Sequence, residues 1–307
     1  MYKRQRKSAL SRLGFDHKTF VKYNDKIITA FAVGFSSDGP YRDLPAYDDI
    51  IQAASGMASY QEAYSDQPSY TSGATADKAT GLMLALSVVS SLFKRNKDNK
   101  DLEVEVPMFE TMVDFTLVEH LYGYNFLPPK DEPVYPRQSS PNRKPYETKD
   151  GFIAVLPYND EQWLRFLKFI KKEHLIKTKK FSTLENRNKN VDELYSLLVK
   201  ELKKEKTNFW IKKLREIDIP SMKINKPKDL FIDEHLKKTN FFKTYKHSTE
   251  GDLMYPRLPV YFNNERDNES KFEAPNLGNK TKEILIDLGY DKNEIENLRK
   301  EKVIFFE

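Results

Sequence analysis

The 307-residue sequence contains no cysteine. Disulfide bonds, thiolate metal sites and a cysteine nucleophile are therefore excluded, and the absence fits a reducing compartment. Histidine is scarce as well. Five histidines are scattered along the sequence without a second histidine at helical spacing, at positions 17, 120, 174, 235 and 247. From this spacing we expect no metal site.

Long hydrophobic runs and a strong net charge are also missing. The longest apolar run, residues 82–93, is interrupted by serines and is shorter than the ~20 residues that cross a bilayer. The basic amino terminus is not followed by the apolar core of a signal peptide. A net charge of +5 from 51 basic and 46 acidic residues is too small to indicate nucleic-acid binding. We expect a cytoplasmic protein without a nucleic-acid or membrane partner.

Common phosphate-binding and nucleophile motifs are absent. The sequence has no GxGxxG after a strand, no GxxxxGK[ST] loop and no GxSxG elbow. The slight basic excess is still compatible with an anionic small ligand, such as a phosphorylated cofactor. A hydrophobic content of 39% supplies enough apolar side chains for a packed core, so we expect a globular protein.

Helical and strand patterns alternate in the first part of the chain. The stretch "KIITAFAVGFSS" is typical of a buried strand, and "YDDIIQAASGMASYQ" has apolar residues at helical spacing. Residues 79–94 are apolar nearly all round, which predicts a buried helix. Residues 102–106 alternate as a short strand, and Pro107 is expected in the first turn of the helix that follows. This alternation predicts an α/β fold.

The second half has a different organisation. Six prolines and no helical period between residues 127 and 146 indicate an inter-domain connection or an active-site loop. A strand and three helices follow, the last of which we expect Thr207 to cap, and they predict a compact α+β unit. The chain ends with two short helices around Gly289.

Asp77 stands immediately before the apolar helix. One hypothesis is that it is the helix N-cap, for which aspartate is a preferred residue. The other is that the free N–H groups and the dipole at the helix start keep it ionised as a nucleophile toward an acyl carbon. Small neighbours would then allow close substrate approach: Ala74, Ala76, Ala79 and Gly81.

Two further side chains have alternative interpretations. Tyr47, in "PAYDDI", has the pattern of a half-buried packing residue with a hydrogen-bonded hydroxyl. Arg12, in "SALSRLG", is either a solvated helix-end charge or a phosphate contact, which a guanidinium suits well.

Several blocks of the sequence are also similar to one known family. In chain order they are "SALSRLGFD", "GFSSDGPYRDLPAYDDIIQAASGM", "ADKATGLMLALSVVSSLFKR", "VEVPMFETMVDF", "PYETKDGFIAVLPYNDEQW" and "APNLGNKTKEILIDLGY". These collinear blocks resemble the family III CoA-transferases, which include formyl-CoA and carnitine CoA-transferases. The resemblance implies that Asp77 is the nucleophile and that Arg12, Leu13 and Tyr47 contact CoA, although Pro45 replaces a basic residue of some members.

The resemblance also implies a reaction. CoA would move from an acyl-CoA thioester to a carboxylic acid through an aspartyl mixed anhydride and an aspartyl-CoA thioester, with CoA as substrate and no permanently bound cofactor. Residues Arg137, Ser139 and Arg143 would lie in a substrate-side loop, where the glycine-rich loop of formyl-CoA transferase is absent. An acyl-CoA racemase of the same family is the alternative, but it pairs its aspartate with a histidine where this chain has Tyr47, a poor substitute.

The family fold is an interlocked homodimer. The resemblance implies a Rossmann-like CoA-binding domain at residues 1–125, a linker or substrate loop at 126–146 and a small α+β domain at 147–226. Residues 227–307 would form a return linker and the rest of the large domain. Family members open with further βαβ units, so the chain is expected to be an N-terminally truncated fragment, and a non-catalytic CoA-binding chain is a third alternative.

Overall fold

The computed structural model describes residues 7–266 and 274–306. Its contacts divide the chain into two compact units, Met1–Ile224 and Asn225–Glu307. The first unit opens with these elements: α1 (Lys7–Arg12), α2 (His17–Val21), β1 (Ile28–Val33), α3 (Asp48–Ala54), α4 (Met57–Tyr60), η1 (Gln61–Ala63), α5 (Thr75–Asp98), β2 (Leu102–Pro107), α6 (Met108–Leu117) and η2 (Tyr122–Asn125).

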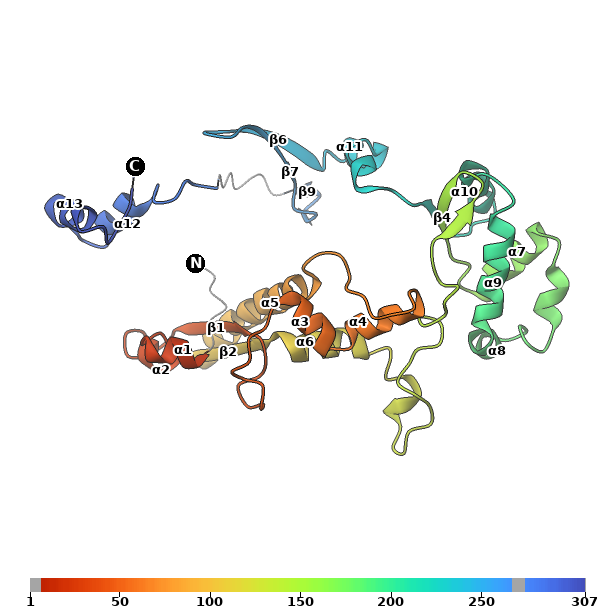
Figure 1. Ribbon diagram of the computed structural model, residues 1–307, viewed down its shortest axis with the longest axis horizontal. Coiled ribbons are helices and arrows are strands. Elements are labelled where there is room, and N and C mark those ends of the chain that lie inside the picture. The colour runs from red at the N-terminus through yellow and green to blue at the C-terminus, as the bar shows by residue number, and fades with distance from the viewer. Residues whose placement is uncertain (1–6, 267–273, 307) are drawn as a thin grey trace. The chain divides into compact units, whose positions relative to one another are not determined.

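Strands β1 and β2 form a parallel pair, in register from Ile28 opposite Leu102 to Val33 opposite Pro107. A parallel pair needs a crossover connection, and here the connection contains α3, α4 and α5. Helix α5 packs against both strands (Figure 1). A small core of Phe35, Ile51, Ala76, Met108 and Met112 joins α3, α5 and α6. The predicted mixed α/β fold is confirmed.

Helix α5 starts earlier than the sequence predicts and is less buried than the sequence predicts. It begins at Thr75, with Ala74 as the N-cap residue, and not near residue 79. Its buried residues are Ala76, Thr80 and Ser91, whereas its large apolar side chains Leu82, Leu86, Val89 and Phe93 are 50–74% exposed. The expectation of a fully buried helix is therefore wrong. Strands β1 and β2 and helices α3 and α6 contact α5, and they leave these large apolar side chains exposed.

Helix α5 also has the length and apolar composition of a membrane-spanning helix. Its 24 residues include an 18-residue window with mean hydropathy 1.3, and it is the single such helix in the described part of the chain. The apolar run of residues 82–93 is shorter than this helix, because small residues extend the helix toward its N-terminus and charged residues extend it toward its C-terminus. A helix from the core of a soluble protein passes the same test, so one such helix is weak evidence for a membrane.

Three element ends also differ from the sequence-based expectation. Gly56, at φ +80°, breaks the expected single helix into α3 and α4, because that left-handed conformation suits glycine. Pro107 is the last residue of β2 and the N-cap of α6, one position earlier than expected. Thr207 is the first helical residue of α10 and not its cap. Its backbone N–H donates to Asp150 Oδ1 at 2.8 Å.

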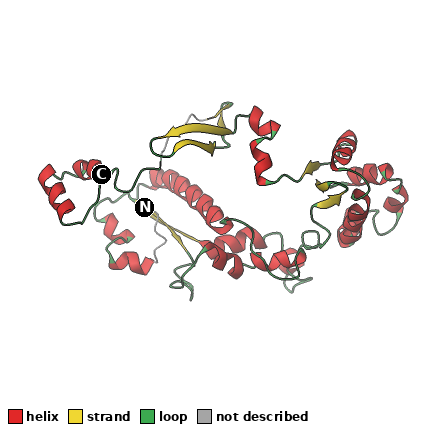
Figure 2. Ribbon diagram, turned by 45° about the horizontal axis from the view of Figure 1, so that its top comes forward, coloured by secondary structure: helices red, strands yellow, loops and turns green. Residues whose placement is uncertain are grey.

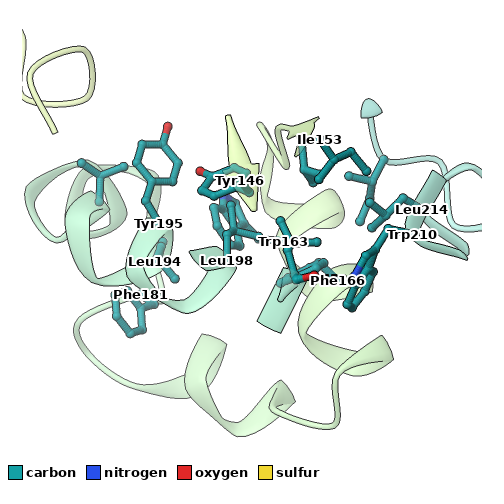
Figure 3. Packing of buried hydrophobic residues seen from close by; sticks show 14 residues of the cluster. Tyr146, Ile153, Trp163, Phe166, Phe181, Leu194, Tyr195, Leu198, Trp210 and Leu214 are labelled. Carbon is teal, nitrogen blue, oxygen red and sulfur yellow. Dashed lines mark hydrogen bonds between the residues drawn. The ribbon is translucent and has the colours of Figure 1, made fainter. Parts of the chain in front are cut away.

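The first unit continues with an α+β arrangement. Its elements are β3 (Tyr146–Thr148), β4 (Gly151–Val155), α7 (Asp160–Phe169), η3 (Glu173–Lys177), α8 (Leu184–Lys189), α9 (Val191–Leu202), α10 (Thr207–Glu216) and β5 (Ser221–Lys223). The three strands pair antiparallel in the order β3-β4-β5. The helices bury apolar stripes against one another and against the sheet, which gives one continuous core (Figure 3).

Aromatic side chains dominate that core. The Trp163 and Phe166 rings of α7 meet edge to face, with centroids 6.2 Å apart, and Leu198 of α9 is fully buried beside them. The Trp210 indole Nε1–H donates to the Leu202 carbonyl at 2.8 Å, so its buried polar atom is satisfied.

The second unit carries short elements. They are η4 (Pro227–Phe231), α11 (Glu234–Lys238), β6 (Phe242–His247), β7 (Gly251–Pro256), β8 (Tyr261–Phe262), β9 (Glu265–Arg266), α12 (Thr281–Asp287) and α13 (Lys292–Lys300). Strands β6 and β7 pair antiparallel as a hairpin, drawn as long yellow arrows in Figure 2. The two helices predicted around Gly289 are confirmed, and this glycine turns the chain at φ +92°.

We expect Leu198→Ala to lower the free energy of unfolding of the aromatic core by about 2–5 kcal/mol, because it leaves a cavity in a fully buried site. Both tryptophans of the sequence lie in this core, so guanidinium unfolding followed by tryptophan fluorescence reports on it directly. Lys200→Ala, at an exposed position of the same helix, is the control and should change stability by less than about 0.5 kcal/mol. Equal effects of the two substitutions would contradict the packing described.

Candidate active site

A cavity of about 550 Å³ lies at the carboxyl ends of β1 and β2. Val33, Gly34 and Phe35 enter it from the end of β1, and Met108 enters it just after β2. The loop of residues 42–47 and the start of α1 complete its lining. Open α/β sheets bind their ligands at the carboxyl ends of the strands. The topology therefore makes this cavity the leading candidate for a ligand site in the first unit.

Two glutamates of β2 hold the lysine of this cavity. Lys7 Nζ lies 2.5 Å from Glu103 Oε1 and 2.9 Å from Glu105 Oε2. Glu105 also accepts hydrogen bonds from the Ser37 backbone N–H, at 2.8 Å, and from the Ser37 hydroxyl. Partial burial alone would raise the pKa of Glu105, but the bonds from Ser37 and Lys7 hold it below its ordinary value. Burial alone would lower the pKa of Lys7, but its hydrogen bonds and charge interactions with Glu103 and Glu105 raise it.

Tyr47 stands at the rim of the cavity as the N-cap residue of α3. Its side chain is 69% exposed, so the interpretation as a half-buried packing residue is wrong. The neighbouring Arg42 also lines the cavity, and its exposed guanidinium Nε lies 3.5 Å from Asp43 Oδ2. The loop thus presents an aromatic ring and a cation to the same space.

Asp77 is the third residue of α5, in its first turn. The hypothesis that Asp77 is the N-cap is therefore wrong, because Ala74 has that position. The electrostatic argument still applies, since an acid in the first turn is stabilised by the helix dipole. The Asp77 backbone N–H donates to Asp48 Oδ1 at 2.9 Å, and Asp48 directly follows Tyr47. The structure thereby places the residue after Tyr47 in contact with Asp77 where α3 and α5 begin, although Asp77 itself does not line the cavity.

Arg12 and Leu13 lie at the other end of α1 from the cavity. Lys7 and Ser8 of this helix line the cavity, whereas Arg12, its last residue, and Leu13 do not. Five residues of helix place Arg12 roughly 8 Å along the axis from Lys7. Both side chains are exposed, Leu13 at 60%. The structure therefore does not join them to the cavity that Tyr47 lines.

The three residues of the predicted substrate loop make contacts in two different parts of the first unit. Arg137 Nε donates to the Tyr195 hydroxyl at 3.1 Å, and its guanidinium stacks 4.7 Å from the Tyr158 ring. Burial would lower the pKa of Arg137, but its contacts with Tyr195 and Tyr135 raise it. This arginine therefore fastens the loop to the aromatic α+β core.

Ser139 and Arg143 instead line a second cavity of about 640 Å³ beside α4. Arg143 Nη1 donates to the Tyr64 hydroxyl at 3.0 Å. Opposite them, the Tyr60 ring stacks on His120 at 3.9 Å, nearly parallel. Burial holds the pKa of His120 below its ordinary value, against the opposing charge of Glu119, and its Nδ1 accepts the Tyr135 N–H at 3.2 Å.

The sequence profile of CoA-transferase family III matches residues 1–281. The chain belongs to CoA-transferase family III. The family resemblance stated from the sequence blocks is thus confirmed, and CoA transfer is the general activity of this family. Among residues 7–266 and 274–306, no group of three metal-ligating side chains is close enough to hold a metal ion.

Curated relatives and a solved structure agree with the family. The chain is 28% identical to the (R)-2-hydroxy-4-methylpentanoate CoA-transferase of Clostridioides difficile, over 97% of this chain and 75% of that protein. It is 27% identical to the cinnamoyl-CoA:phenyllactate CoA-transferase of Clostridium sporogenes, over 97% and 74%. A crystal structure of a CaiB/BaiF family protein from Brucella suis has a TM-score of 0.71 at 23% identity, over 92% and 74%. That likeness establishes the fold.

No sequence motif marks several residues near the two cavities and the start of α5. Lys7 and Glu105 gave no signal in the sequence, because their contact joins residues 98 positions apart. Asp48 and Gln52 did offer a sequence signal, since a spacing of four on a helix places both side chains on one face. His120 has no metal-ligand spacing in the sequence, yet in the structure it is 6% exposed and stacked on Tyr60.

We expect Glu105→Gln to lower the free energy of unfolding near neutral pH by roughly 1 kcal/mol, because a charge-assisted pair at a partly exposed site is lost. The depressed pKa of Glu105 means that its contribution is present above its ordinary value of 4.5 and is lost as the pH falls through the folded-state pKa. The raised pKa of Lys7 means that the pair is also lost as the pH rises above 10.5.

Thermal unfolding of parent and variant across this pH range measures the difference. It should be largest near neutrality and vanish at both extremes. Glu132→Gln, in an exposed loop, is the control and should show no such profile. A difference between Glu105→Gln and the parent that does not depend on pH would contradict the ion pair.

Proposed function

We propose that the chain transfers CoA from an acyl-CoA thioester to a carboxylic acid, with Asp77 as nucleophile. The observation that carries the proposal is the placement of Asp77 in the first turn of α5, hydrogen-bonded through its backbone to the residue after Tyr47. Family membership supports the reaction class. The helix dipole favours the ionised carboxylate that such an attack needs.

The first half of the reaction moves CoA onto the protein. The Asp77 carboxylate attacks the thioester carbonyl carbon, and the carbon–sulfur bond breaks to leave a mixed anhydride and the CoA thiolate. The thiolate then attacks the Asp77 carbonyl carbon. This step releases the donor acid as its carboxylate and leaves an aspartyl-CoA thioester.

The second half runs the same chemistry in reverse with the acceptor. The acceptor carboxylate attacks the aspartyl thioester, which gives a second mixed anhydride and free thiolate. Attack of the thiolate on the acceptor carbonyl forms the new acyl-CoA and restores Asp77. Each anhydride must be kept from water, and the loop that carries Ser139 and Arg143 is the proposed substrate-side wall.

CoA contacts are proposed for Tyr47, Arg12 and Leu13. The exposure of Tyr47 at the cavity rim supports its role, because a ligand can reach it. Arg137 is proposed as an anchor of the substrate loop, through its contact with Tyr195. CoA enters as a substrate and no permanently bound cofactor is required.

The proposal includes a cytoplasmic homodimer of the interlocked type, with a Rossmann-like large domain made from both ends of the chain. The exposed apolar face of α5 supports a further covering element, since apolar patches of this kind mark interaction surfaces in soluble proteins. The same exposed face favours the alternative of a non-catalytic CoA-binding chain whose large domain is incompletely covered.

Mass spectrometry of the intact chain incubated with acyl-CoA donors tests the nucleophile. We expect a covalent adduct of one CoA less one water, and transfer to an added acid. Acids to try first are 2-hydroxy acids with branched or aromatic side chains, because two relatives carry such acids in their names. Asp77→Ala should lose both adduct and transfer, whereas Asp98→Ala, at the far end of α5, should keep them.

Transfer by Asp77→Ala at the rate of the parent would refute the assignment. Binding of CoA without adduct or transfer in the parent would establish the non-catalytic alternative.

Exchange of the acyl-CoA α-proton with solvent separates transfer from racemisation. Racemisation needs a general acid and base on opposite faces, and a tyrosine at position 47 suits that role poorly. We therefore expect no deuterium uptake at the α-carbon in heavy water without an acceptor acid. Deuterium uptake that survives omission of every carboxylic acid would favour the racemase.

A further inference from the structure

The buried side-chain amide of Gln52 contacts the segment that leads into α5. Gln52 of α3 is 0% exposed, and its side chain makes a full set of hydrogen bonds. Its Oε1 accepts from the Thr71 backbone N–H at 2.9 Å and from the Thr71 hydroxyl at 3.1 Å. Its Nε2 donates to Asp48 Oδ2 at 2.7 Å and to the Thr71 carbonyl at 3.5 Å. A primary amide has two donors and two acceptor sites, so none is left unsatisfied.

Asp48 connects this amide to Asp77. While Asp48 Oδ2 accepts from Gln52, its Oδ1 accepts the Asp77 backbone N–H at 2.9 Å. A helix normally receives this third-residue bond from the side chain of its own N-cap, but Ala74 has no acceptor. Asp48 therefore caps α5 from a different helix, and Gln52 fixes the orientation of the capping carboxylate.

The segment that leads into α5 is held by the same amide. Thr71, bound to Gln52 through three atoms, lies four residues before the helix start, and its hydroxyl is 3.0 Å from the hydroxyl of Thr75. The loop of residues 71–74 is thus fastened on one side by Gln52 and on the other by Asp48. Buried hydrogen-bond networks that are fully satisfied restrict a segment to one geometry.

We propose that Gln52 and Asp48 are positioning residues for CoA transfer, which act by fixing the first turn of α5 and so the direction of the Asp77 carboxylate. This inference rests on the proposed role of Asp77 as nucleophile. Neither side chain is required to touch substrate. A reacting atom displaced by about 1 Å can cost roughly 100-fold in rate, so an error in the helix start is expected to appear in the chemical step.

Exchanging the amide of Gln52 and the carboxylate of Asp48 between the two positions tests the hydrogen bond that joins them. Gln52→Glu removes both amide donors and sets a carboxylate against Asp48 across a 2.7 Å contact. Asp48→Asn forces its new amide group to face either the donor of Gln52 or the N–H of Asp77. The double variant restores complementarity at the contact between positions 48 and 52, because the introduced asparagine keeps an oxygen for Asp77 and donates its amide group to the introduced glutamate; only the long 3.5 Å bond to the Thr71 carbonyl stays lost.

We expect each single variant to lower kcat by roughly 10- to 100-fold, with KM within about threefold of the parent, and to slow adduct formation in a single turnover by the same factor. The double variant should recover to within about threefold of the parent. Asp49→Asn changes a neighbouring exposed charge outside the network and should leave kcat unchanged. A merely structural role would change thermal stability without this reciprocal rescue of kcat.

Parallel assays of Asp77→Ala separate the two proposals. If Asp77→Ala is inactive while both single variants turn over like the parent, the positioning role is refuted and the nucleophile stands. If Asp77→Ala forms acyl-CoA as fast as the parent, the nucleophile is refuted and the positioning role with it. Should Gln52→Glu fail to fold, Thr71→Val removes one donor to the amide at a half-buried site and must lower kcat in the same way.

Discussion

The parallel pairing of β1 with β2 determines where the candidate site of this chain lies. Because the two strands run the same way, their carboxyl ends meet at one edge, and the crossover between them must pass over the sheet. That crossover delivers the starts of α3 and α5 to one place. Asp48 and Asp77, 29 positions apart in sequence, come into hydrogen-bond contact through this arrangement and not through any local motif. The cavity at the same edge follows from the same constraint.

Two helix starts, those of α5 and α10, are supported by residues distant in sequence. The N-cap positions of α5 and α10 hold Ala74 and Lys206, neither of which makes a side-chain cap bond. In both cases a carboxylate from another segment accepts a first-turn N–H, Asp48 for α5 and Asp150 for α10. A carboxylate in that position satisfies a donor and also complements the helix dipole. Tertiary contacts thus take over a task usually done within four residues of sequence.

Local patterns predicted most element types well. The strand "KIITAFAVGFSS", the break at the prolines and the two helices around Gly289 follow from apolar periodicity and from turn residues, which act over a few positions. Element ends were less predictable, as Gly56, Pro107 and Thr207 show, because each end depends on the backbone conformation or contacts of a single residue. Burial of α5 was predicted wrongly, since periodicity measures how apolar a helix is and not what covers it.

The sequence by itself determined the family, the alternation of helices and strands, and Asp77 as the acid beside an apolar helix. Those features depend on residue type and on spacing along one segment. Only the tertiary structure decided that Asp77 is the third residue of its helix, that Asp48 caps it, and that the predicted substrate loop divides between Arg137 at the aromatic core and Arg143 at the second cavity. These outcomes depend on contacts between residues 29 to 79 positions apart, and no local pattern records which distant side chain folding will bring into hydrogen-bond range.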